Sequence, residues 1–182
     1  MAQKKMSMQT PQDLFVHELS DMLSSEQIIA NMLEETAGAV QNPQLKQGLQ
    51  QHLQQTKQQA KNIETIFQQL GTQPHPVVCH AAEGLRQSIL TVMQSNPSPE
   101  VLDGAVLAGG CKTEHLEIAG YTGLIEKAQA MGQPQIAGLL QENLQQEQQT
   151  LQQLEMISQQ MTKQMAAMMQ GTQMMDQSAS AM

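Results

Sequence analysis

The sequence predicts an all-α fold: an antiparallel four-helix bundle with one long crossover that carries a short fifth helix. Three observations lead to this prediction. Apolar residues recur at spacings of three, four and seven through most of the chain. Prolines and capping residues divide the chain into four long segments and one short one. No segment shows the two-residue alternation that is typical of a β-strand.

The first helix should begin at Pro11 and continue to about Val40. Thr10 is a favourable N-cap residue, and Asp13, three positions later, completes a capping box. Proline suits the first turn because the N–H group that it lacks would have no partner within the helix. Asn42, followed directly by another proline, gives the same signal for a second helix.

The second helix should end at Gly71, because glycine is favoured just after the last helical turn. Residues 71–76 form a connection interrupted by prolines, and a short helix is expected over residues 79–94. Ser98, just before Pro99, is the N-cap signal of the third long helix.

The third long helix should stop at Gly132, and Pro134 should begin the fourth, which is expected to reach about Gln170, before Gly171. Both hairpin connections are very short, so the helices that they join must be antiparallel. The middle connection is long enough to cross the whole bundle. Two hairpins joined by one long crossover form the ferritin-like arrangement, which is the fold class that we predict.

This division gives three regions: a flexible N-terminal segment (1–10), the bundle (11–160) and a methionine-rich helix extension and tail (161–182). The methionines of the third region can serve as flexible core or as an oligomer surface, which is the favoured interpretation. Binding of Cu(I) by their thioethers is the alternative. The last dozen residues are expected to be disordered.

Composition limits the function classes. Net charge is −8, which disfavours nucleic acid as a partner. No stretch is apolar and long enough to span a membrane, and Cys79 and Cys111 form no CxxC pair, so a cytoplasmic location is expected. Roughly a fifth of the residues are glutamine, which indicates a helical surface of low charge rather than an aggregating segment.

Four polar residues occupy positions where the periodicity places core residues, one on each long helix: Glu26, His52, Glu114 and Glu147. A buried carboxylate is unfavourable unless it is compensated, and a metal ion is the usual compensation inside a helix bundle. Glu117 lies about one turn from Glu114 on the same side of its helix. Carboxylate oxygen and imidazole nitrogen suit iron and manganese, so these five residues are the candidate metal ligands.

Counting along the helices from each hairpin divides the five residues between two adjacent levels, about 5–7 Å apart. One level holds His52, Glu117 and Glu147, and the other holds Glu26 and Glu114. This separation suits one or two metal ions.

A buried hydrogen-bonded network without a metal is the alternative, and Lys57 could then place its ammonium group among the carboxylates. In the absence of a cation, burial and like charges should raise the pKa of some of these carboxyl groups. His115 directly follows Glu114, so it points about 100° away from that residue and is a poor candidate ligand.

Four segments resemble the YciE/YciF-like family of bacterial stress proteins, a ferritin-like family long described as a domain of unknown function. The most specific is the string Glu-His-x-Glu-Ile-Ala-x-Tyr. The four segments are Leu14–Gln27, His52–Thr56, Cys79–Leu85 and Lys112–Tyr121. The resemblance covers roughly residues 10–155 and implies a dimeric four-helix bundle, a two-metal carboxylate site and a role in stress responses.

Two departures from the family pattern affect the implied site. The family usually has acidic residues where this chain has Gln55 and Leu151. A neutral amide binds iron or manganese weakly, and leucine offers no ligand atom. All five candidate ligands do match the family pattern.

We therefore expect a stress-associated protein that binds one or two iron or manganese ions weakly, or none, and that is not an enzyme. If it is an enzyme, an oxidase or peroxidase reaction at a non-haem metal is the expected chemistry. The alternative is a non-catalytic structural or interaction protein that has lost its metals. A homodimer is expected in either case.

Overall fold

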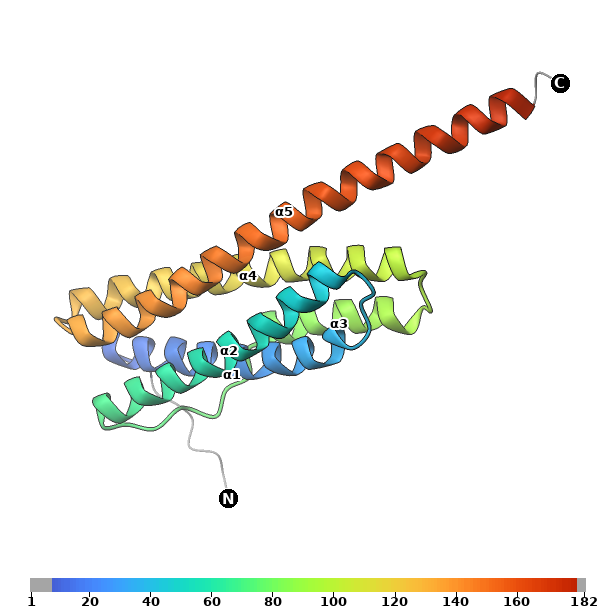
Figure 1. Ribbon diagram of the computed structural model, residues 1–182. Coiled ribbons are helices and arrows are strands. Elements are labelled where there is room, and N and C mark those ends of the chain that lie inside the picture. The colour runs from blue at the N-terminus through green and yellow to red at the C-terminus, as the bar shows by residue number, and fades with distance from the viewer. Residues whose placement is uncertain (1–7, 180–182) are drawn as a thin grey trace.

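A computed structural model describes residues 8–179 of the chain, with side chains described for residues 8–166. Its elements are α1 (Pro11–Ala37), α2 (Pro43–Leu70), α3 (His80–Gln94), α4 (Pro99–Ala130) and α5 (Pro134–Ala179). The four long helices form a bundle, and the short α3 lies in the crossover between α2 and α4 (Figure 1). The described part of the chain contains no strand, so the all-α prediction is confirmed. Within it, no helix combines the length and the hydropathy that a membrane span needs.

The helix ends follow the capping chemistry of the sequence. The Thr10 hydroxyl accepts a hydrogen bond from the N–H group of Asp13 at 3.1 Å, and the Asp13 carboxylate accepts one from the N–H group of Thr10 at 2.9 Å. The side chains of Asn42 and Ser98 accept hydrogen bonds from N–H groups in the first turns of α2 and α4. Gly71 ends α2 with φ of 64°, a conformation that residues with a side chain rarely adopt.

Two helix ends differ from the prediction. The first helix ends at Ala37 rather than at Val40, because Gly38 forms its C-cap, although Val40 remains buried in the core. The last helix passes through Gly171 and continues to Ala179. A glycine inside a helix costs only about 1 kcal/mol relative to alanine, and helix-forming residues flank this one on both sides.

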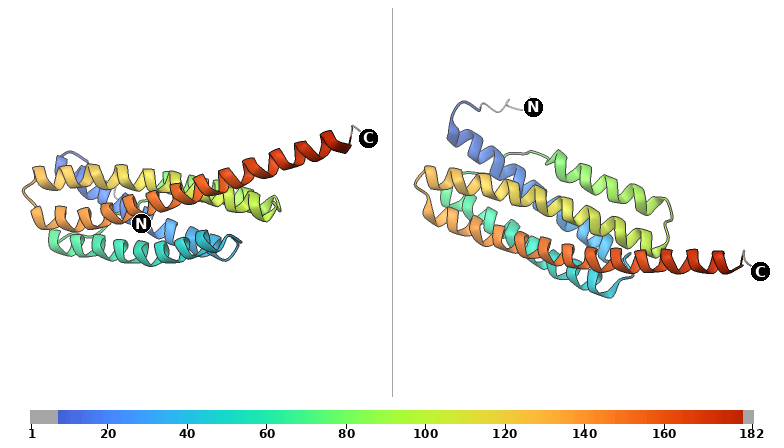
Figure 2. Two further views of the ribbon diagram at one scale, coloured as in Figure 1. Left: turned by 45° about the horizontal axis from the view of Figure 1, so that its top comes forward. Right: turned by 90° about the horizontal axis from the view of Figure 1, so that it is seen from above.

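The two hairpins lie at opposite ends of the bundle (Figure 1). The carboxylate of Asp103, near the start of α4, accepts hydrogen bonds from the N–H groups of Gln41 and Asn42, at 2.8 Å each. These bonds tie the start of α4 to the α1–α2 hairpin. The long helices surround the interior in the order α1, α2, α5, α4, and α3 packs against α1 and α4 (Figure 2).

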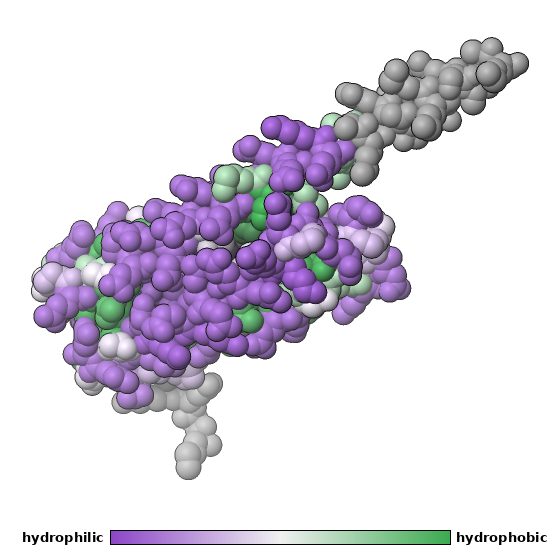
Figure 3. Space-filling view, viewed as in Figure 1, coloured by the Kyte–Doolittle hydropathy of each residue, from purple (hydrophilic) through white to green (hydrophobic). Residues whose placement is uncertain are grey.

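A polar layer divides the interior into two apolar clusters. The first cluster includes Phe15, Ile63 and Leu140, and the second includes Leu45 and Leu154. Between them lie buried polar side chains from all four long helices. Outward faces are mainly hydrophilic (Figure 3) and carry most of the glutamines. The core is therefore aliphatic on both sides of one polar belt.

The C-terminal part of α5 projects beyond the bundle (Figures 1 and 2). Met161 packs partly against the second apolar cluster, whereas Met165 is exposed. The predicted role of the later methionines concerns side chains outside the described range. The predicted flexible N-terminal segment and the predicted tail also fall partly outside residues 8–179.

Candidate metal centre

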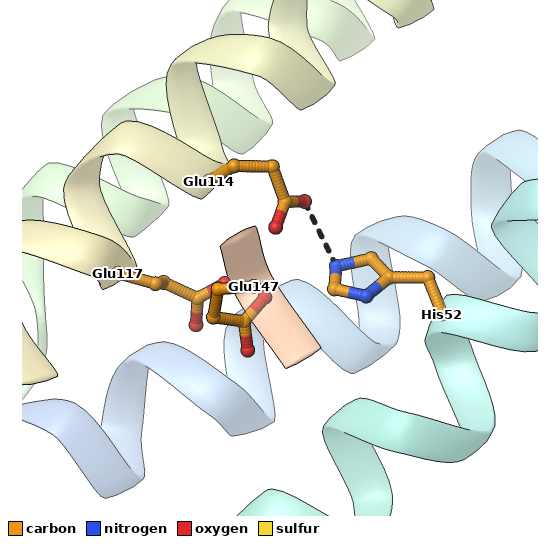
Figure 4. Close-up of side chains that lie close together, drawn as sticks. All are labelled: His52, Glu114, Glu117 and Glu147. Carbon is orange, nitrogen blue, oxygen red and sulfur yellow. Dashed lines mark ion pairs between the residues drawn. The ribbon is translucent and has the colours of Figure 1, made fainter. Parts of the chain in front are cut away.

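Four of the five predicted ligands come together in the polar layer. We call His52, Glu114, Glu117 and Glu147 the four-residue cluster. Each offers one ligand atom, and these atoms all lie within 4.8 Å of one another. The side chains come from α2, α4 and α5 and point toward a common centre (Figure 4). None is more than 3% exposed.

The imidazole of His52 approaches Glu114 without forming a hydrogen bond. Its Nε2 atom lies 3.0 Å from Oε1 of Glu114, but the two groups are not aligned as donor and acceptor. Neither ring nitrogen of His52 has a hydrogen-bond partner among the described residues. The ring is therefore free to offer a lone pair to a metal ion.

The carboxylates of the cluster are also without partners. Both oxygens of Glu117, both oxygens of Glu147 and Oε2 of Glu114 are buried and accept no hydrogen bond within the described part of the chain. Leaving a buried polar group unpaired costs about 1–3 kcal/mol, and more for a charged group. Native proteins rarely collect such atoms in one place, and this group could hold a cation.

Electrostatics in the metal-free protein oppose ionisation of the cluster. Burial away from water, followed by the neighbouring carboxylates, raises the pKa of Glu117 well above its usual range. Burial and the adjacent Glu114 do the same to the pKa of Glu147. Burial raises the pKa of Glu114 to about 7 and lowers the pKa of His52. A bound cation would reverse these trends by favouring the charged carboxylates and the neutral imidazole.

Glu26, the fifth predicted ligand, lies beside the cluster rather than in it. Its Oε1 atom accepts a hydrogen bond from the hydroxyl of Tyr121, and its Oε2 atom has no partner in the described residues. The Tyr121 hydroxyl accepts a bond from Nδ2 of Asn143 at 3.0 Å, and Oδ1 of Asn143 accepts one from Nδ2 of Asn62 at 2.7 Å. Burial and the charge of Glu147 raise the pKa of Glu26 well above its usual range.

Asn143 and Tyr121 belong to this network, although neither was among the predicted site residues. Asn143 stands four residues before Glu147 and so shares its face of α5. This spacing could have predicted that Asn143 faces the interior. Gln59, fully buried with both amide atoms unpaired among the described residues, was also missed. The only sign of its burial in the sequence was that Gln59 falls on the interior face of α2, among many exposed glutamines.

The predicted division into two levels was wrong. In the structure, the side chains of His52 and Glu114 lie at the same height along the bundle. Glu114 stands eleven residues beyond Asp103, the α4 residue that is bonded to the α1–α2 hairpin. Glu117 and Glu147 are level with each other, each fifteen residues from the turn at Gly132. The prediction treated both hairpins as if they lay at the same end. Because they lie at opposite ends, one turn toward the hairpin means opposite directions on α2 and α5. The two true layers are about 4.5 Å apart, which glutamate side chains can bridge.

Lys57 takes no part in the polar layer. Its ammonium group lies at the surface, 2.6 Å from Oε1 of Glu34. The predicted metal-free network therefore does not contain the ammonium group of Lys57. His115 is exposed, in agreement with its predicted direction. Gln55 and Leu151, where the family pattern has acids, are half-buried at the edge of the interior.

Comparisons with known proteins identify the family. The family model described as a domain of unknown function (DUF892) matches residues 10–167. The chain belongs to the DUF892 family. It is 35% identical over 146 residues to Protein YciF of Escherichia coli K12, an alignment that covers 80% of this chain and 88% of that protein. The resemblance seen in the sequence is thereby confirmed.

Solved structures of similar proteins share the fold. The crystal structure of the E. coli stress protein YciF matches with a TM-score of 0.82 and 32% identity, over 86% of this chain and 99% of that one. YcfI from Rhodopseudomonas palustris, described as a putative structural protein, matches with a TM-score of 0.78 and 32% identity, over 85% and 98%. A Xanthomonas campestris protein at 22% identity, with a TM-score of 0.67 over 90% and 99%, shows the fold alone.

Proposed function

We propose that this chain is a stress-associated member of the DUF892 family that binds one iron or manganese ion at the four-residue cluster, with no assigned reaction. The observation that carries the proposal is the set of buried carboxylate oxygens of Glu117 and Glu147, none of which has a hydrogen-bond partner among the described residues. A cation is the group that best satisfies such a set.

The ligand types favour a hard first-row ion. Three carboxylates and one imidazole offer oxygen and nitrogen donors, which suit iron and manganese. Three negative charges balance a trivalent ion, and they leave a net charge of −1 around a divalent one. The metal would supply Lewis acidity and, for iron or manganese, access to a second oxidation state. The protein would supply a site whose ligand side chains are buried inside the bundle.

A single ion fits this chain better than two. A second ion would need further acidic ligands, and the chain has Gln55 and Leu151 where the family pattern supplies them. Glu26 is the remaining acid nearby, and Tyr121 already occupies one of its oxygens. Glu26 would therefore complete the coordination shell of one ion through Oε2, or accept a hydrogen bond from a water molecule bound to that ion.

Metal analysis of the purified protein tests the proposal. Protein purified from cells supplied with iron and manganese should carry close to one equivalent of metal, and Glu114→Gln should lose it. Glu126→Gln, an exposed change on the same helix, is the matched control and should retain the metal. A wild-type protein that carries no metal, and whose melting temperature does not respond to a chelator or to added Mn²⁺, would contradict the proposal.

A structural or interaction role without a metal is the second candidate. The hydrogen-bonded chain from Glu26 through Tyr121 and Asn143 to Asn62 favours it, because a buried polar network can by itself fix the packing of four helices. R. palustris YcfI is described as a putative structural protein. This candidate requires full stability in the presence of chelator and no loss of function in Glu114→Gln.

Self-association and location complete the proposal. We propose a homodimer, tested by light scattering on the full chain.

We also propose a cytoplasmic location, supported by the two free cysteines Cys79 and Cys111, since unpaired thiols suit a reducing compartment. Fractionation of cells that produce the protein tests the location.

A further inference from the structure

We infer that an apolar pocket between α2 and α5, with Gly48 at its entrance, admits a small uncharged molecule of diatomic size to the four-residue cluster. The inference extends the proposed function, since it names the class of molecule that would meet the bound metal. The pocket itself is a property of the metal-free chain and can be tested without a metal.

The pocket ends on the cluster. It lies on the side of the polar layer that faces the α1–α2 hairpin, and all four long helices line it. Its inner end is formed by His52 and Glu114, which are 3% and 1% exposed. The ring nitrogens of His52 and the Oε2 atom of Glu114 have no hydrogen-bond partner in the described residues. A molecule in the pocket would therefore meet the open side of the cluster.

The walls and the size of the pocket select its occupant. Aliphatic side chains such as Ile29, Leu49 and Leu154 form the walls. The pocket has a volume of about 20 Å³, and roughly 10–15 Å³ is enough for one water molecule. A hydrated ion would lose its water against these walls without compensation, so an uncharged occupant is favoured. A molecule of one or two heavy atoms is the largest that this volume favours.

An outer groove at the surface adjoins this pocket. The groove runs between α2 and α5, has a volume of about 300 Å³ and is lined mainly by glutamines. Gly48, Gln153 and Ile157 line both the groove and the inner pocket, so the two spaces meet at these residues. A path from solvent through these two spaces would pass from amide side chains to aliphatic ones and end at His52.

Gly48 lines both spaces where they adjoin. A Cβ atom at this position would meet no other atom within 4 Å, so the space beside the Gly48 backbone is empty. A Cβ atom therefore fits there without a clash, and we expect a leucine side chain to occupy the space beside it. Glycine is also unfavourable inside a helix by about 1 kcal/mol relative to alanine, so a replacement should leave α2 at least as stable.

Xenon binding to the metal-free wild-type protein is the first test. Xenon is uncharged and occupies dry apolar cavities. Crystals held under xenon pressure should show one xenon atom between Leu49, Leu154 and His52. Absence of xenon from this pocket would overturn the inference. This measurement does not depend on metal binding, so it separates a failure of the pocket from a failure of the proposed function.

Gly48→Leu is the second test, with Gly84→Leu on α3 as the matched control. A Cβ atom at Gly84 also meets nothing within 4 Å, and Gly84 lines neither space. Gly48→Leu should lose the xenon site, and in ferrous-loaded protein it should slow the association of nitric oxide with the metal by about tenfold or more. Gly84→Leu should change neither, and both variants should keep their metal. Equal rates in the three proteins, or xenon retained in Gly48→Leu, would refute the assigned entrance.

Discussion

Replacement of Glu114 by glutamine should make the metal-free protein more stable at neutral and alkaline pH. The folded protein raises the pKa of this carboxyl from 4.5 to about 7, because the side chain is buried away from water. A carboxyl with a raised pKa keeps its proton in the folded state while the unfolded chain has already released it. Stability therefore falls as pH rises from about 4.5 to about 7 and then levels off for this group.

The size of the expected stabilisation follows from the pKa shift of Glu114. One pKa unit corresponds to 1.36 kcal/mol, so a shift from 4.5 to about 7 corresponds to about 3 kcal/mol. Glutamine has nearly the same shape and never ionises. In the presence of chelator, Glu114→Gln should therefore gain up to about 3 kcal/mol over wild type at pH 8, relative to their difference at pH 4.5.

Urea unfolding at a series of pH values measures this difference. His52 acts in the opposite sense, since its pKa is lowered by burial, and its contribution to stability is lost as pH falls below 6.5. Comparing variant with wild type at each pH removes most of that contribution. A difference between Glu114→Gln and wild type that does not change between pH 4.5 and 8 would refute the reasoning. So would a growing loss of stability in the variant as pH rises.

A bound metal should reverse this pH dependence, so that stability rises rather than falls with pH. Coordination requires ionised carboxylates, so binding of Mn²⁺ should release protons and become tighter as pH rises from 5 to 8. Titration calorimetry in buffers of different ionisation enthalpy counts the released protons. Binding without proton release would contradict the raised pKa values of Glu114, Glu117 and Glu147.

Three further predictions concern the frame around the cluster. Asp103→Ala removes the acceptor of two backbone N–H groups at the α1–α2 hairpin and should lower the free energy of unfolding by about 2–3 kcal/mol in urea, with an unchanged m-value. Tyr121→Phe removes the donor to Glu26 and should cost about 1–3 kcal/mol in the metal-free protein; an unchanged urea midpoint would mean that this bond carries no net stability. Gly71→Ala should cost about 1 kcal/mol because φ is 64° there, whereas Gly84→Ala in α3 should stabilise by a similar amount, and thermal melting compares the two.

Much of the fold could be predicted because the signals are local. A capping box at Thr10, the Asn42 and Ser98 caps and the glycines after α2 and α4 act within one helical turn, and the structure has each of them. The end of α5 could not be predicted in the same way. One glycine at position 171 is a weak stop signal, and good helix formers on both sides outweigh it.

The sequence by itself determined which side chains face the interior, because helical phase depends only on spacing: Glu26, His52, Glu114, Glu117 and Glu147 are all buried. Only the tertiary structure decided which of them meet. The relative height of two helices depends on which ends the hairpins occupy, and that placed His52 beside Glu114 and left Glu26 with Tyr121, a residue 95 positions away. No local pattern encodes a contact of that separation, since it forms only when four helices pack around one centre.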